Sequence, residues 1–87
     1  MKVIFRKFKK DSHGIKGGEV IAFLPKIKEV NPGMMMSYMH IGQHGEADYY
    51  GCLSTTIPAN ESEYRELKKE LEQIYGEAIK PIRRYNR

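Results

Sequence analysis

The strongest pattern in this 87-residue sequence is a single amphipathic helix flanked by segments that have the character of strands. Asn60 is a good N-cap, and Glu63 three residues later forms the second half of a capping box. From Tyr64 to Tyr75 apolar side chains recur at helical spacing, and Gly76 is the residue type that most easily adopts the left-handed conformation after a helix. The sequence therefore predicts one helix between Asn60 and Gly76.

The remaining regular segments alternate at a period of two or are continuously apolar, as strands do. A turn at residues 31–33, Asn-Pro-Gly, separates two of them, and a glycine-containing loop over residues 11–18 separates two others. Residues 42–58 contain three glycines and read as irregular, with a weak extended piece at 51–56. The expected strands cover residues 2–10, 19–27, 34–41 and 78–87, the last confined to an edge by Pro81.

These elements predict an α+β fold: a small antiparallel sheet of three to four strands, in the order β-β-β-α-β, with one helix packed on one face. A chain of this length forms a single domain, residues 1–87. One helix buries only one face of a sheet. On the other face, either the strand ends fold over it or it binds another molecule.

Composition excludes several classes of protein. Apolar residues are 40% and charged residues 30% of the chain, which is ordinary for a globular domain. No apolar run approaches the ~18 residues of a membrane-spanning helix, so we expect no membrane partner. The segment after Met1 is charged too early for a secretory signal. A single cysteine makes no internal disulfide, and a cytoplasmic location is the default expectation.

Charge is distributed unevenly along the chain. The net charge is +4, but residues 1–28 carry +6, residues 29–64 carry −5 without any Lys or Arg, and residues 65–87 carry +3. If the first and last strands pair, the two basic ends converge on one edge. Clustered cations bind phosphate backbones, although Lys and Arg on edge strands also prevent aggregation. The predicted polyanion-binding residues are Arg6, Lys7, Lys9, Lys10, Lys80, Arg83, Arg84 and Arg87.

The middle of the chain is rich in tyrosine, methionine and histidine, residue types that are common at protein interfaces or sites of chemistry. On a helix, the spacing of His40, His44 and Asp48 would suit a metal, but the glycines between them argue against a helix, and we expect no metal site. Cys52 beside a histidine could form a thiol–imidazole pair, although free cysteines are more often small buried residues. The predicted protein-interaction residues are Tyr38, His40, His44, Asp48, Tyr49 and Tyr50.

Three stretches, residues 1–10, 36–45 and 58–67, resemble short uncharacterised proteins encoded on conjugative and phage-like elements of gut bacteria. The resemblance implies a mobile-element origin, where host-defence inhibitors such as anti-CRISPR proteins and accessory transfer factors are common. It transfers no catalytic residue.

Together, these observations predict a small non-enzymatic binding protein without a cofactor, whose basic ends contact nucleic acid or a nucleoprotein. One alternative is a protein-interaction module or host-defence inhibitor that binds a host protein through the tyrosine-rich segment. Another is a small metal- or thiol-dependent enzyme. The chain is compatible with a monomer or a homodimer.

Overall fold

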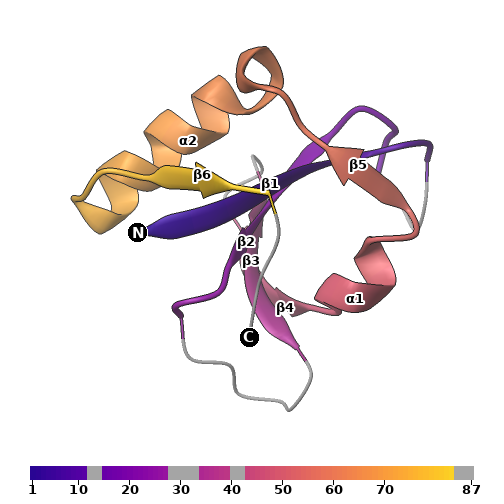
Figure 1. Cartoon of the computed structure of the whole chain (residues 1–87), viewed down its shortest axis with the longest axis horizontal. Helices are drawn as coiled ribbons and strands as arrows, with labels where there is room; N and C mark the ends of the chain where they lie inside the picture. The colour runs from indigo at the N-terminus through magenta and orange to yellow at the C-terminus, as the bar shows by residue number, and fades with distance from the viewer. Residues whose placement is uncertain (12–14, 28–33, 40–42, 84–87) are drawn as a thin grey trace.

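The computed structural model describes residues 1–11, 15–27, 34–39 and 43–83. In these residues six strands form one sheet, and a long and a short helix pack against it (Figure 1). The strands are β1 (Lys2–Phe8), β2 (Val20–Leu24), β3 (Met35–Met39), β4 (Gln43–Ala47), β5 (Thr56–Pro58) and β6 (Lys80–Ile82), and the helices are α1 (Tyr49–Cys52) and α2 (Glu61–Tyr75).

The sheet has the strand order β4-β3-β2-β1-β5, and each of these neighbours is antiparallel. On its outer side, β1 pairs with two short strands, one along each half of its length. β6 pairs in parallel with Lys2–Ile4, and β5 pairs with Arg6–Phe8. The first and last strands described are therefore neighbours. The basic ends were expected to converge on one edge if these two strands paired.

The α+β class and the main helix on one face of the sheet are confirmed. The observed order of elements is β-β-β-β-α-β-α-β, longer than the expected β-β-β-α-β. The difference lies within the segment 42–58, which was expected to be irregular with a weak extended piece at 51–56. Of that piece, residues 51 and 52 belong to α1 and only Thr56 belongs to a strand, β5. Gly45 adopts an extended backbone within β4, and Asp48 caps α1 by accepting a hydrogen bond from the Gly51 N–H at 3.0 Å.

α2 begins and ends where the sequence predicts. The side chain of Asn60 accepts from the Glu63 N–H at 3.0 Å, and the Glu63 carboxylate accepts from the Asn60 N–H at 2.9 Å. Gly76 has a φ of 67°, in the left-handed region that glycine tolerates best. In the described part of the chain, neither helix is long and apolar enough to cross a membrane.

The face of the sheet beneath α2 forms one core. Val3 and Phe5 of β1 point toward Leu67 and Leu71 of the helix, and all four side chains are buried. The ring of Phe5 stacks on that of Tyr64 with their centroids 4.4 Å apart. This core buries the stripe of α2 that the helical spacing predicts, except near its end, where Ile74 remains half exposed.

The opposite face of the sheet is also covered. Tyr49 of α1 is 2% exposed, and its ring meets that of Phe23 edge to face at 5.1 Å. Ile15 and Ile82 pack against the same cluster, which includes the buried Ile4. The sequence left open whether strand ends fold over this face or it binds another molecule. In the structure, it is covered by Ile15, by Ile82 at the end of β6, and by a short helix that the sequence pattern did not predict (Figure 1).

We predict that Leu71→Ala lowers the free energy of unfolding by about 2–5 kcal/mol, because it opens a cavity where Leu71 is fully buried. The matched control is Ile74→Ala on the same helix, at a side chain that is 48% exposed, for which we expect a loss of about 0.5 kcal/mol. Urea unfolding measures both values. Similar losses for the two variants would contradict the assigned helix face.

Candidate nucleic-acid interface

The pairing of β6 with β1 brings basic residues from both ends of the chain together. Lys2 lies directly beside Lys80 in the parallel register, and Arg83 follows β6 by one residue. All three side chains are exposed. Like charges at directly paired positions of a sheet repel each other, so this arrangement concentrates positive potential at the outer side of β1.

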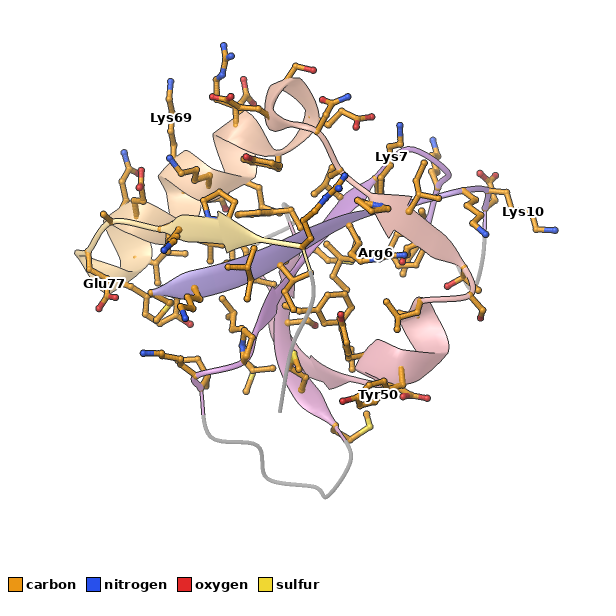
Figure 2. The ribbon with its side chains drawn as sticks, viewed as in Figure 1. Arg6, Lys7, Lys10, Tyr50, Lys69 and Glu77 are labelled. Atoms are coloured by element: carbon orange, nitrogen blue, oxygen red, sulfur yellow. The ribbon has the colours of Figure 1, made fainter. Side chains whose placement is uncertain are left out.

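More basic residues lie at the far end of the same strand. The Lys9 N–H continues the pairing with β5 by donating to the Thr55 carbonyl at 3.1 Å, and the exposed Lys9 Nζ donates to the Ser54 carbonyl at 3.2 Å. Lys10 is exposed and extends beyond the end of the sheet (Figure 2). We call the exposed cations along this margin the basic edge: Lys2, Lys9, Lys10, Lys80 and Arg83.

None of the five cations of the basic edge forms an ion pair with an acid in residues 1–11, 15–27, 34–39 or 43–83. The nearby acid Glu77 instead lies 2.8 Å from the ammonium group of Met1. The edge spans about 23 Å from Lys2 to Lys9 at the rise of an extended strand. Measured along the axis of B-DNA, that length corresponds to roughly seven phosphates of one strand.

Arg6, a predicted polyanion ligand, faces the interior instead (Figure 2). It is 9% exposed, and its Nε donates to Thr56 Oγ1 at 2.8 Å. Its Nη2 donates to the carbonyls of Thr56 at 2.7 Å and Leu53 at 3.4 Å. Thr56 Oγ1 in turn donates to the Cys52 carbonyl at 2.6 Å. Arg6 therefore joins β1, β5 and the turn after α1, and it is not part of the basic edge.

Lys7 is also engaged within the fold. Its Nζ forms a hydrogen-bonded ion pair with the Glu63 carboxylate in the first turn of α2. Hydrogen bonds from the Asn60 backbone and from Lys7 hold the pKa of Glu63 below its usual value. The ion pair reduces the positive potential that Lys7 offers to a ligand. The remaining predicted cations, Arg84 and Arg87, lie outside the described residues.

Lys2 is a site residue that was not among the predicted ligands. In the sequence, Lys2 could be recognised only as a basic residue of the expected first strand. The register of β1 with β6 shows that it pairs with Lys80. Of the three aromatic residues in the basic segments, Tyr85 lies outside the described residues, and the other two are not available to a ligand. Phe5 and Phe8 are buried, so in this fold neither ring is free to stack on a base.

The predicted protein-interaction residues do not gather at one place. Tyr38 is buried beneath α2, where its hydroxyl hydrogen-bonds the Glu70 carboxylate, and Tyr49 is buried in the core of the opposite face. Asp48 and Tyr50 are exposed at the start of α1 (Figure 2). His40 lies outside the described residues, and His44 occupies a position in β4 across from Tyr38. Alternation in β3 explains the buried position of Tyr38, because it shares a face with Met36.

Cys52 is the last residue of α1, and its side chain is partly buried against the core that includes Tyr49. Burial, and next the negative charge of Asp48, raise its pKa above the ordinary value, which lowers the fraction of reactive thiolate at neutral pH. Among the described residues, no three His, Cys, Asp or Glu side chains are grouped as a metal would require.

Comparison of the sequence with family models and curated proteins, and of the structure with solved structures, found no match. The relation to proteins of mobile elements therefore stays a prediction from the sequence. The interpretation of function rests on the geometry of this chain.

We predict that Arg6→Gln destabilises the fold by about 2–3 kcal/mol, because it removes charge-assisted hydrogen bonds that satisfy buried acceptors. Thr56→Val, which removes the shared hydroxyl, provides the second arm of a double-mutant cycle. The two losses are expected to be less than additive because the side chains contact each other. Additive losses, measured by urea unfolding, would contradict the proposed coupling.

The hydroxyl of Tyr38 provides a prediction at alkaline pH. Its hydrogen bond to Glu70, and next its burial, raise the pKa of Tyr38 to about 12. In the unfolded chain the group ionises near 10, so its contribution to stability is present below about pH 10 and is lost toward pH 12. Ultraviolet titration of tyrosinate should show a late transition near pH 12 whose amplitude falls by one tyrosine in Tyr38→Phe. Burial also raises the pKa of Tyr75, so some late titration remains in the variant. An unchanged amplitude near pH 12 in Tyr38→Phe would contradict the assignment.

Proposed function

We propose that this protein is a small non-enzymatic nucleic-acid-binding protein, and that the basic edge contacts the phosphate backbone. The observation that carries the proposal is the parallel pairing of β6 with β1, which puts Lys80 beside Lys2. Both lysines are exposed, and neither has an ion-pair partner among the described acids. A phosphate ligand would relieve the repulsion between them.

The chemistry of the edge favours phosphate contacts over base recognition. Sequence-specific or single-strand recognition uses side chains that reach base edges or aromatic rings that stack on bases. The described basic edge contains only Lys and Arg, and the neighbouring Phe5 and Phe8 are buried. We therefore expect binding with little dependence on base sequence and with a steep dependence on salt, because neutralised phosphates release their counterions.

The test is fluorescence anisotropy with labelled duplex DNA, single-stranded DNA and RNA across a salt series. If three to five cations of the basic edge contact phosphates, log K should fall against log salt with a slope of about −3 to −4.5 on duplex DNA. Absence of binding at low salt would contradict the proposal.

Charge reversal locates the site. The double variant Lys80→Glu and Arg83→Glu should weaken binding and make the salt slope shallower by about two, one for each phosphate that the variant no longer neutralises. The matched control is Arg65→Glu with Lys69→Glu, two exposed cations on α2 whose reversal changes the net charge equally (Figure 2). Equal effects of the two double variants would indicate attraction by net charge alone and would contradict a defined site.

A protein-binding function is the second candidate, and the exposed apolar surface at α1 favours it. Tyr50 is 49% exposed and Leu53, in the turn after the helix, is 37% exposed. Protein interfaces have an apolar and aromatic centre and a polar rim. Tyr50 and Leu53 resemble such a centre, and the neighbouring Asp48 resembles the rim. Under this function, Tyr50→Ala would abolish formation of a complex with a host protein, and the reversal of Lys80 and Arg83 would leave it intact.

A further inference from the structure

The two edges of the sheet differ in how well they are protected against pairing with another strand. At the outer side of β1, β5 and β6 are three residues long, each contains a proline, and the exposed Lys80 lies on β6. Short strands, proline and lysine are the usual means of blocking an edge. This side of the sheet is closed to further strands.

The opposite edge, β4, lacks this protection. It pairs with β3 over five consecutive positions without a bulge, from Met35 opposite Ala47 to Met39 opposite Gln43. Its sequence, QHGEA, contains no proline, lysine or arginine. In the described part of the chain, β4 ends the sheet, on the side away from β5 and β6 (Figure 1). Among the described residues, no strand therefore lies beside its outward N–H and C=O groups.

The sequence of β4 is complementary to itself in the antiparallel direction. If two copies pair about a two-fold axis at Gly45, position 44 of one copy lies opposite position 46 of the other, in both halves of the pair. These positions hold histidine and glutamate, so a hydrogen-bond donor is paired with a carboxylate twice. Gln43 would lie opposite Ala47, and no like charges would face each other.

The residue on the axis also suits such a pair. Gly45 is exposed, and a Cβ atom placed on it would have no atom within 4 Å. Its φ is not in the left-handed region, so other residues fit there without backbone strain. A substitution at the axis therefore changes the contact between copies and not the interior of the fold.

From the unprotected edge and its self-complementary register, we infer that the protein forms a homodimer in which β4 pairs antiparallel with β4 of a second copy, centred on Gly45. The two sheets then become one continuous sheet, with a basic edge at each far end. The inference does not depend on what the basic edge binds. A pair of five-residue strands is smaller than a standard interface of about 1,600 Å², so the dimer dissociates on dilution, with a Kd on the order of 100 μM.

Sedimentation velocity of the whole chain over a concentration series tests the inference. We expect a monomer at low micromolar concentration and a dimer near 1 mM, on either side of that Kd. A chain that stays monomeric at every concentration overturns the inference. A β4 edge that pairs only with strands of other proteins would give this same result.

Variants at Gly45 locate the contact. Gly45→Lys and Gly45→Asp each put like charges on the axis, and each should weaken the homodimer at least tenfold, while Gly45→Thr, a good strand former, should not weaken it. An equimolar mixture of the Lys and Asp variants should recover a dimer, because opposite charges then meet. A dimer that Gly45→Lys leaves unchanged, or a mixture that stays monomeric, overturns the proposed interface.

Hydrogen exchange of the unaltered chain tests the same contact without substitution. Amides of residues 43–47 should exchange more slowly at high concentration than at low concentration, while amides of β1 should not change. Concentration-dependent protection elsewhere, with none in β4, overturns the inference. None of these three tests uses nucleic acid, so they fail or succeed independently of the proposed function.

Discussion

The pairing of β1 with three other strands is the constraint on which the rest of the structure depends. One side of β1 binds β2, and the other side is divided between β6 and β5. Its side chains alternate between two cores, with Val3 and Phe5 beneath α2 and Ile4 on the face that α1 covers. A single seven-residue strand thereby fixes where both helices, both short strands and the basic residues of both chain ends lie.

Arg6 shows how the same strand also determines which charges can bind a ligand. It lies on β1 between two buried apolar positions of the same face, Ile4 and Phe8. A guanidinium at such a position is compatible with the fold only because Thr56 and the turn after α1 provide acceptors. Lys9 and Lys10 follow β1 directly, and their side chains are exposed.

The sequence was most informative where local rules decide the outcome. Asn60, Glu63 and Gly76 define α2 through contacts within one turn of the chain, and these contacts form as predicted. It was least informative over residues 43–58. There, glycine in β4 is tolerated because β3 supplies the pairing, and the four-residue helix α1 depends on one side-chain cap and on burial of Tyr49. Both the pairing and the burial come from tertiary contacts, which a single-sequence pattern does not contain.

The candidate site was predictable to the extent that it depends on charge. The basic character of both ends is visible in the sequence, but which cations are exposed follows from strand register and from partners distant in the chain. Lys7 is paired with Glu63, and Lys2 gains its place only through Lys80. Tyr38 was assigned to a surface because aromatic residues are common at interfaces, whereas the pleat of β3 turns it toward α2.

The contact between β1 and β6 also has a consequence for the order in which the fold can assemble. During synthesis β1 leaves the ribosome before the other strands of this sheet, yet one half of its outer side stays unpaired until residues 80–82 have emerged. Loop closure over so long a separation in sequence is slow compared with formation of a hairpin or helix. The antiparallel strands and α2 can form earlier, so the nascent protein exposes the open side of β1 to chaperones or to neighbouring chains until β6 arrives.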